Sequence, residues 1–403
     1  MRIAHVSYEY PPDTAFGGIA TYVYQVSHML RDRGHSVEVF CGSTTRIASE
    51  EYEGITVHRV LSMQNTFRER VLEVFKSRHE QHPFDLMESP EYMGDGLVIK
   101  QAYPALPLVV KLHSPESLLR ELMTFYDAPP PLLRRLRYLA VAALRGKLDH
   151  QYWKWTRKED DVEYRLCTLA DQIHTPSISL GQIVVARWGV DKTKIHHVPY
   201  PFIPNEKFLA IPTDTNSQTF TYMGRLEVRK GIIALVDAAK LIFAALPKAR
   251  FMLVGADQSS HIPGLSMRNF VEQQLAQHLD KVSFLEVQKE GVPAVLAQTD
   301  VCVYPSLWEN FPNVCLEAMS AGRAVVGSIE GGMRDMLESP EAGLLVQPTN
   351  VQQIADAVIT LLRDQPLREK LGKAARNKVL TDYNSAVIGE LVEAKYGEVI
   401  KKN

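Results

Sequence analysis

Two glutamates, Glu309 and Glu317, stand eight residues apart in the stretch PSLWENFPNVCLEAMSAG, residues 305–322. An apolar run over residues 300–304 predicts a strand ahead of them, and the proline and asparagine residues that follow it predict a loop. Residues 314–319 are then expected to form a helix that a glycine ends. One carboxylate therefore lies ahead of the helix and the other lies inside it.

The start of that helix is expected to offer free backbone N–H groups at Asn313, Val314 and Cys315. A helix N-terminus of this kind is a ready site for phosphate. A carboxylate just inside the helix can accept both hydroxyls of a ribose, and one ahead of it can hold another polyol. The layout fits a nucleotide sugar, whereas an ordinary surface loop and amphipathic helix is the alternative interpretation.

A second charged group lies in GRLEVRKG, residues 224–231, directly after a predicted strand at 220–223. Arg225 and Lys230 are spaced across one loop at a strand end, where two cations can hold a diphosphate from two sides. A helix is expected over residues 232–245, so the loop also meets a helix N-terminus. Either basic residue alone would be an ordinary surface charge.

A glycine pair, Gly17 and Gly18, separates a predicted strand at residues 3–7 from a predicted helix at 20–33. This order predicts a βαβ unit whose glycines let a backbone approach a phosphate, although a plain turn would use the same residues. A full GxGxxG pattern is absent, which argues against a dinucleotide-dependent dehydrogenase.

Three polar residues follow later strands of the same half. His113 comes at the end of a predicted strand at 108–112, where ligand sites of open α/β sheets lie. Glu88 ends the preceding strand and Glu91 lies in the loop beyond it, so either is a candidate for the acceptor side of a site. A single histidine is more often structural than functional.

The motifs together resemble those of the retaining GT-B glycosyltransferases of family 4. Glu309-x7-Glu317 followed by AMSAG resembles the family signature, and GRLEVRKG resembles its G-R-L-x-x-x-K-G loop. His113 matches the histidine that follows the family's P-x-V-x-x-x-H strand. One segment departs from the pattern, because Tyr200-Pro201 stands where the family has Asn-Gly. The resemblance spans nearly the whole chain.

The resemblance implies roles for particular residues. Residues implied to be catalytic are His113, Arg225, Lys230 and Glu309. Residues implied to bind the donor are Gly17, Gly18, Arg225, Lys230, Val287, Asn310, Phe311, Pro312, Asn313, Val314 and Glu317. In the family the histidine hydrogen-bonds the donor sugar, and backbone near the position of Val287 reads the nucleobase.

The length of 403 residues is too great for one ordinary core, and the strand–helix rhythm restarts in the second half. With the resemblance, this predicts an α/β protein of the GT-B fold, in which two Rossmann-like domains with parallel sheets face a central cleft. Residues 1–203 are expected to bind the acceptor and residues 204–382 the nucleotide sugar. A last helix, residues 383–403, is expected to cross back onto the first domain.

Residues 116–165 are expected to form a helical insert that interrupts the alternation of strands and helices. Its part from 132 to 158 carries eight Lys or Arg and one acid, interleaved with leucines and tryptophans. That pattern suggests contact with a membrane surface or a lipid-linked acceptor. A solvated insert over the acceptor site is the other interpretation, favoured because the acidic residues 159–161 follow at once.

Bulk composition excludes several classes of protein. A net charge of −2 gives no case for nucleic acid as a partner. The four cysteines lack CxxC spacing and read as buried thiols in a reducing compartment. No apolar run approaches the ~18 residues of a membrane span. The pattern at the N-terminus predicts a short strand and a turn rather than a signal peptide. We therefore expect a cytoplasmic enzyme, placed peripherally at the inner membrane face if the basic segment touches lipid.

The function predicted is retaining transfer of a hexose-type sugar from a nucleotide sugar, with a UDP-sugar favoured, to a hydroxyl acceptor in polysaccharide or glycolipid synthesis. No Asp-x-Asp triplet occurs, so neither a metal nor another cofactor is expected. The alternatives are a nucleotide-sugar 2-epimerase on the same fold and a catalytically silent nucleotide-sugar-binding subunit. We expect Glu317→Ala chiefly to weaken nucleotide binding, and Arg225→Ala or Lys230→Ala chiefly to slow transfer.

Overall fold

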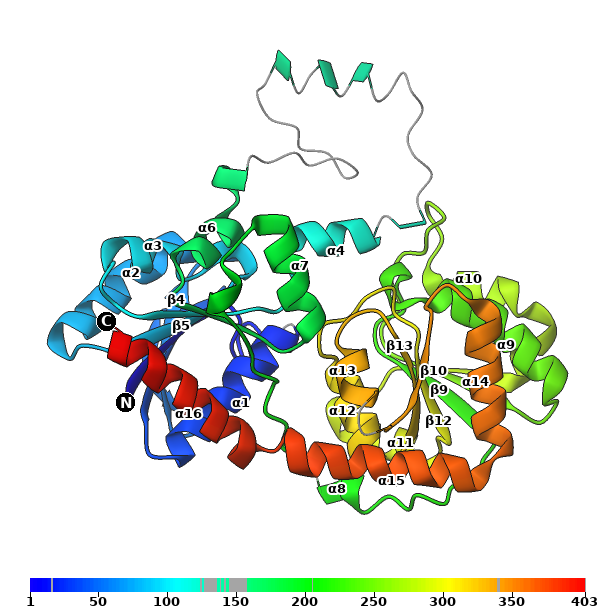
Figure 1. Cartoon of the computed structure of the whole chain (residues 1–403). Coiled ribbons are helices and arrows are strands. Elements are labelled where there is room, and N and C mark those ends of the chain that lie inside the picture. Colours follow the sequence, from blue (N-terminus) through cyan, green and yellow to red (C-terminus); the bar gives the residue numbers. More distant parts are fainter. Residues whose placement is uncertain are drawn as a thin grey trace. The chain divides into compact units, whose positions relative to one another are not determined.

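The structure is a computed structural model that describes residues 1–15, 17–123, 125–126, 136–137, 139–140, 143–144, 158–204, 206–338 and 341–402. These residues divide into two compact units (Figure 1). The first contains residues 1–120, 158–201 and 385–402, and the second contains the described residues of 121–126 and 202–384.

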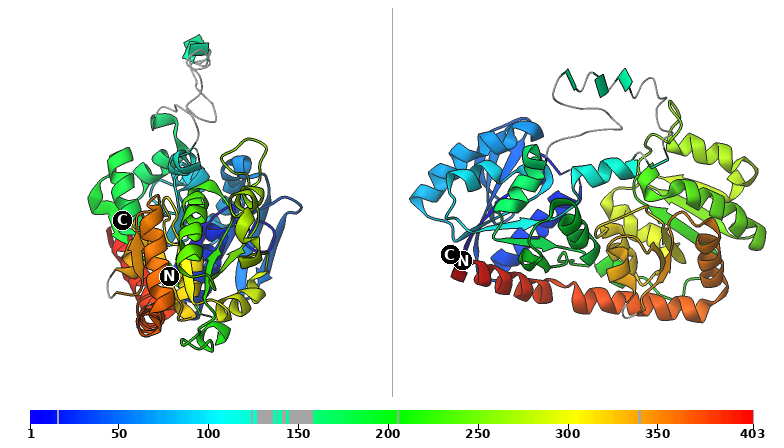
Figure 2. Two further views of the ribbon diagram at one scale, coloured as in Figure 1. Left: turned by 90° about the vertical axis from the view of Figure 1, so that its right-hand side faces the viewer. Right: turned by 45° about the horizontal axis from the view of Figure 1, so that its top comes forward.

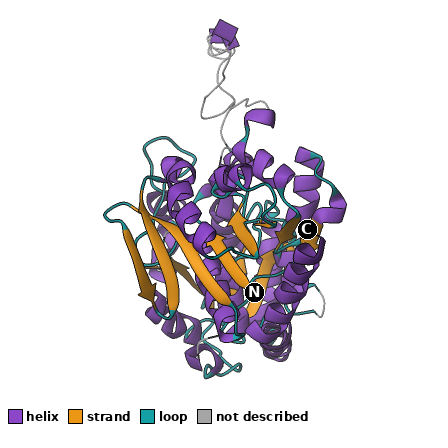
Figure 3. Cartoon of the chain, turned by 90° about the vertical axis from the view of Figure 1, so that its left-hand side faces the viewer, coloured by secondary structure: helices purple, strands orange, loops and turns teal. Residues whose placement is uncertain are grey.

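The first unit is built on an eight-stranded sheet with the order β3-β4-β2-β1-β5-β6-β7-β8. The sheet is parallel except where β3 pairs antiparallel with β4. The central strands are buried on both faces, as parallel strands covered by helices require (Figure 3). The strands are β1 Arg2–Val6, β2 Ser36–Ser43, β3 Ala48–Tyr52, β4 Ile55–Leu61, β5 Leu86–Pro90, β6 Leu108–Lys111, β7 Gln172–Thr175 and β8 Ile195–His197.

Helices cover this sheet, and the last helix of the chain is one of them. They are α1 Gly18–Asp32, α2 Gln64–Gln81, α3 Leu97–Ala102, α6 Val162–Leu169, α7 Ile178–Trp188 and α16 Ser385–Lys402. Helix α16 lies beside α1 (Figure 2), and the guanidinium of Arg33 pairs with Glu393 at 2.7 Å. Helix α4, Glu116–Met123, follows β6.

The second unit has a six-stranded, fully parallel sheet with the order β11-β10-β9-β12-β13-β14. This is the Rossmann strand order 3-2-1-4-5-6, in which the direction of winding reverses between the first and fourth strands. The strands are β9 Thr219–Met223, β10 Arg250–Val254, β11 Val282–Leu285, β12 Val301–Tyr304, β13 Ala324–Ser328 and β14 Leu344–Val346. The helices are α8 Glu206–Leu209, α9 Ile232–Ala245, α10 Met267–Gln274, α11 Val292–Ala297, α12 Asn313–Ser320, α13 Met333–Leu337, α14 Val351–Arg363 and α15 Gln365–Asp382.

The two sheets confirm the predicted α/β class with two parallel-sheet domains. Residues 211–215, which lead from the first unit into β9, are anchored to the second unit by three arginines. Arg376 donates to the carbonyl oxygen of Ile211 at 2.7 Å, and Arg368 donates to that of Thr215 at 2.7 Å. Arg323 donates to the Thr215 hydroxyl at 2.7 Å. This segment is therefore part of the second unit rather than a free connection.

Candidate active site

The predicted donor residues of the second unit gather where its sheet changes direction. Strands β9 and β12 are neighbours, and both point their carboxyl ends to the same edge of the sheet. The loop 224–231 follows β9, and the loop 305–312 follows β12 and leads into α12. The fold thus places two charged loops side by side, although about eighty residues separate them in the sequence.

The two loops approach each other through their backbones. Gly231 has φ +75°, and a Cβ there would lie 1.8 Å from the carbonyl oxygen of Pro305. The N–H of Leu307 donates to the carbonyl oxygen of Arg229 at 2.8 Å. This close approach requires a glycine at position 231 and explains the last residue of the motif.

A cluster of charges results from this approach. Glu309 contacts the Lys230 ammonium and, at 2.7 Å, the Arg229 guanidinium. Arg229 also pairs with Glu227 at 2.8 Å. Arg225 is 59% exposed and lies 3.5 Å from Glu227, so its guanidinium is open to solvent. The structure brings Arg225, Lys230 and Glu309 together and adds Arg229 and Glu227, which the sequence did not single out.

The charged groups in this cluster shift one another's pKa values. Burial alone would raise the pKa of Glu309, but Lys230 and Arg229 outweigh burial and hold that pKa below its ordinary value. Burial lowers the pKa of Lys230, and the attraction of Glu309 opposes this. Glu309 is therefore a carboxylate at neutral pH.

The glycine loop at residues 330–333 also contacts the backbone of Glu309. The N–H of Gly332 donates to the carbonyl oxygen of Glu309 at 2.8 Å. Gly331 has φ +91°, and a Cβ there would lie 2.0 Å from the same carbonyl oxygen. The backbone of Glu309 is thereby fixed beside β13.

Helix α12 begins after Pro312 and carries no side-chain cap. The N–H of Cys315 donates to the Pro312 carbonyl oxygen at 3.0 Å, so Cys315 was wrongly included among the free donors. Asn313 and Val314 remain, and within the part of the chain that the structure describes their N–H groups have no hydrogen-bond acceptor. The helix start therefore offers two donors, which is still suited to an anion.

The other predicted residues of this loop lie around the helix start. Asn310 and Phe311 are buried, and the ring of Phe311 packs edge-on against Tyr383 at 5.2 Å between centroids. Val287 is half-buried and lies close to Gly291. Phe311 thus supports the loop through packing, and the predicted donor contacts of Asn310, Phe311, Pro312 and Val287 stay predictions.

Glu317 sits inside α12, half-buried, and its carboxyl makes no hydrogen bond or ion pair with any described residue. Burial raises its pKa to about 7, against a small opposing effect of Lys289. A half-buried carboxylate without a protein partner is suited to bind hydroxyl groups of a ligand.

In the first unit, His113 follows β6 and is fixed by two contacts. Its backbone N–H donates to both oxygens of Glu91 at 2.8 Å, and its Nδ1 lies 2.7 Å from the Tyr200 hydroxyl. Burial, reinforced by Lys111, lowers the pKa of His113 to about 3, so the imidazole is neutral. Tyr200, which departs from the family pattern, thus contacts the ring.

Glu88 and Glu91 are both buried, and their oxygens accept hydrogen bonds from protein groups. Glu88 accepts from Tyr22 at 2.8 Å and from Tyr396 of α16 at 2.6 Å. The structure therefore assigns both carboxylates to holding strand ends. Contact of either one with an acceptor stays a prediction.

Gly17 and Gly18 lie at the start of α1, and nothing lies within 4 Å of where a Gly18 Cβ would be. Phe16 lies outside the described residues. Glu9, which the sequence did not point to, lies 3.4 Å from the N–H of Ala20. A carboxylate therefore already stands at this helix start, and any phosphate there would meet it.

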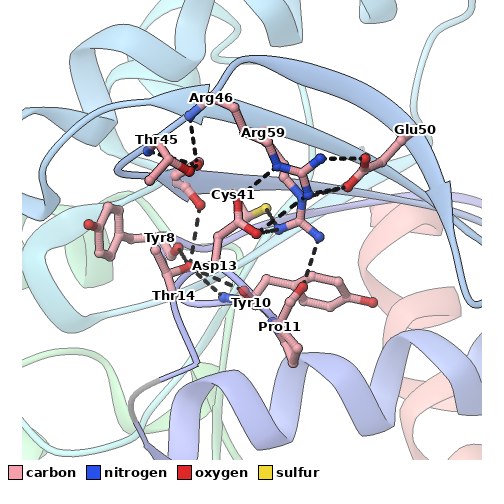
Figure 4. A network of polar contacts seen from close by, with 12 residues as sticks. Tyr8, Tyr10, Pro11, Asp13, Thr14, Cys41, Thr45, Arg46, Glu50 and Arg59 are labelled. Carbon is pink, nitrogen blue, oxygen red and sulfur yellow. Dashed lines mark hydrogen bonds and ion pairs between the residues drawn. The ribbon is translucent and has the colours of Figure 1, made fainter.

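A buried network around Arg59 holds the loop that carries Glu9 (Figure 4). Arg59 is fully buried and donates to the carbonyl oxygen of Pro11 at 2.9 Å and to Glu50 at 2.7 Å. Thr14 donates to the carbonyl oxygen of Tyr8 at 2.7 Å and closes the loop on itself. Residues 8–14 are thus held in place by hydrogen bonds within the protein.

We expect Arg59→Met to lower the free energy of unfolding by ~2–3 kcal/mol, because the Pro11 carbonyl loses its donor and Glu50 loses a buried partner. Arg59 also lies 3.8 Å from Asp13, and Arg46 contacts both carboxylates, Glu50 and Asp13, from the surface. Arg46→Met is the matched control and should cost far less. Equal losses in urea unfolding would contradict the assigned role of Arg59.

Most of the basic segment 132–158 lies outside the described residues, so the membrane interpretation stays a prediction. Among the helices that are described, none has the length and apolar character needed to span a membrane. No grouping of three or more His, Cys, Asp or Glu in the described ranges is arranged to hold a metal ion.

Two family models match the chain. The model for glycosyl transferases group 1 matches residues 205–378, and the model for glycosyltransferase family 4 matches residues 16–204. Glycogen synthase of Mycobacterium tuberculosis is 26% identical over 99% of this chain and 96% of its own length. A D-inositol 3-phosphate glycosyltransferase of Thermomonospora curvata is 26% identical over 94% of this chain and 90% of its own.

Solved structures share the fold. Sucrose-phosphate synthase from Thermosynechococcus elongatus superposes with a TM-score of 0.73 at 22% identity, covering 100% of both chains. Anabaena HepE in complex with UDP-glucose superposes with a TM-score of 0.67 at 18% identity, covering 99% of this chain and 100% of its own.

Proposed function

The chain belongs to the group 1 and family 4 glycosyltransferases, and we propose that it is a hexosyltransferase that moves a sugar from a UDP-sugar to a hydroxyl acceptor with retention of configuration. The observation that carries the proposal is the charge cluster at the switch point of the second sheet, where Arg229 and Lys230 contact Glu309 and Arg225 lies beside Glu227, next to an uncapped helix start. The UDP and UDP-glucose complexes of HepE support the choice of base.

The chemistry follows from where charge develops. As the glycosidic bond to the diphosphate breaks, negative charge grows on the leaving phosphate. Preorganised cations and backbone donors aimed at that charge are the largest source of rate acceleration. Arg225, Lys230 and the N–H groups at the start of α12 supply them at one sheet edge.

We assign one carboxylate to the hydroxyls of the transferred sugar and another to those of the ribose. Glu309, ionised and fixed through its backbone, accepts hydroxyls of the transferred sugar. Glu317, which lacks a partner among the described residues, accepts hydroxyls of the ribose. His113 is neutral and acts as a hydrogen-bonding group toward the sugar rather than as a general base. We further propose that the reaction proceeds without a metal ion and in the cytoplasm, where nucleotide sugars are available.

The test is to incubate the protein with UDP-, GDP- and ADP-hexoses and a panel of hydroxylated acceptors in EDTA, and to follow nucleotide release and product by NMR. We expect nucleotide release that depends on an acceptor, and a product anomer equal to that of the donor. Release with a 2-epimeric sugar and no acceptor would identify an epimerase. Binding without release would identify a silent subunit.

Donor affinity should depend on pH through Glu317. The carboxyl has a pKa of about 7 and must be ionised to accept two hydroxyls, so binding expels a proton and tightens as pH rises. Between pH 6 and pH 8 the affinity for a UDP-sugar, whose diphosphate diester does not titrate in this range, should rise ~10-fold. Calorimetry should show weaker and pH-independent binding for Glu317→Gln. A wild-type affinity that is flat over this range would contradict the role of Glu317.

A further inference from the structure

The two cations that contact Glu309 bind only one of its two carboxylate oxygens. Both Arg229 Nη1, at 2.7 Å, and the Lys230 ammonium contact the same oxygen, Oε1. Within the described ranges no hydrogen bond reaches the other oxygen, Oε2. The Glu309 side chain is 12% exposed, so it is not sealed from a ligand. One oxygen thus ties the carboxylate to the protein, and the other is left to accept a hydroxyl.

Arg229 and Lys230 differ in how firmly they are held. Arg229 spans two carboxylates, with Nη1 on Glu309 at 2.7 Å and Nε on Glu227 at 2.8 Å. Its carbonyl oxygen also accepts the Leu307 N–H. Among the described groups, the Lys230 ammonium contacts Glu309 alone. A planar guanidinium holds two partners in fixed directions, whereas an ammonium on a flexible stem exchanges partners readily.

We propose that Arg229 is a positioning residue for Glu309, holding the carboxylate through Oε1 while Lys230 turns to the donor diphosphate and Oε2 takes a sugar hydroxyl. This inference rests on the proposed function. Lys230 and Glu309 neutralise each other in the structure. When a diphosphate arrives, Arg229 remains as the partner of Glu309, anchored in turn by Glu227.

The role of Arg229 follows from what its removal would do to Glu309. Without it, Lys230 alone would hold the carboxylate, and Glu309 would lose its fixed position when that ammonium turns to the diphosphate. A lysine at position 229 cannot replace Arg229, because all the N–H groups of an ammonium share one nitrogen, whereas Glu227 and Glu309 are contacted by two separate nitrogens of a rigid guanidinium. The contribution of the sugar to donor affinity should then fall, while binding of the nucleoside diphosphate itself should persist.

The same arrangement predicts a pH signature. The groups facing Glu309 are Arg229 and Lys230, with Glu227 beyond Arg229 and the Tyr222 hydroxyl nearby. Burial raises the pKa of Glu309 and the two cations lower it, so removal of Arg229 raises it. At saturating donor, where bound Glu317 is already ionised, the acid limb of the kcat profile should therefore move to higher pH in Arg229→Met.

The experiment compares UDP-glucose with UDP, and the corresponding GDP and ADP pairs, by calorimetry on the wild type, Arg229→Lys and Arg229→Met. Both variants should lose ~10-fold in affinity for the nucleotide sugar and no more than about twofold for the nucleoside diphosphate. Glu227→Gln keeps the side-chain shape and should show the same pattern with smaller amplitude, so the inference can be tested even if a variant at position 229 does not fold. Arg334→Met, in a surface ion pair with Glu338, should change neither affinity nor pH profile.

Equal losses for nucleotide sugar and nucleoside diphosphate, or an unmoved acid limb in Arg229→Met, would overturn the inference. If the wild type binds one pair and the variants bind it equally well, the inference alone fails. If the wild type binds no pair, the proposed function fails and the inference fails with it.

Discussion

Lys230→Ala should lower kcat ~10²–10³-fold while leaving the affinity for donor within a few-fold. The ammonium contacts Glu309, which precedes α12, and lies on the loop that follows β9. We expect it to bind a diphosphate held at the start of α12. Its charge stabilises the leaving phosphate most strongly when the glycosidic bond is breaking. The loss should therefore appear in the chemical step rather than in binding.

The matched control is Lys240→Ala, which removes a lysine of α9 that pairs with Asp237 on the surface. It should retain full turnover, because exposed ion pairs contribute little. Single-turnover rates with a saturating donor give the comparison directly. Lys230→Ala with an unchanged rate would refute the electrostatic account of the leaving group.

Gly231→Ala should destabilise the second unit by at least ~3 kcal/mol and lower its Tm by ~6 °C or more. Two costs add. The φ of +75° is unfavourable for alanine, and its Cβ would stand 1.8 Å from the Pro305 carbonyl oxygen. The β12 loop would have to move, and that movement would carry Glu309 away from Lys230.

Gly264→Ala separates the two costs. Gly264 has a similar φ of +81°, but nothing lies within 4 Å of where its Cβ would be. This variant should lose only ~1 kcal/mol, the cost of the backbone conformation. If both variants lost equal stability in calorimetric unfolding, the close approach of the loops at Pro305 would not be a real constraint.

Much of the fold could be predicted because its signals are local. The parallel strands read as short apolar runs, and helices such as 232–245 show helical spacing, so the alternation of strand and helix predicted two parallel-sheet domains. No helix or strand was predicted over residues 42–84. Strand β3 is polar and half-exposed, and α2 buries only Phe67, Val71 and Phe75, so neither carries a strong apolar pattern.

The site was predicted in part for the same reason. Arg225, Lys230, Glu309 and Glu317 belong to recognisable local motifs. Arg229 and Glu227 lie in one of those motifs but look like surface charges until the β12 loop is placed beside them. Arg59 and Tyr200 act on segments far away in the chain, and the neutral state of His113 arises from burial that no local pattern reports.

The most direct test of the central claim is the thermal shift produced by UDP, GDP, ADP and their sugars in EDTA. A nucleotide at 100-fold over its Kd adds about 2.7 kcal/mol to the stability of the folded protein. The account predicts a clear rise in Tm with one nucleotide and its sugars, and loss of that rise in Glu317→Ala. A wild-type Tm that none of these ligands changes would contradict a metal-free donor site at the charge cluster and the start of α12.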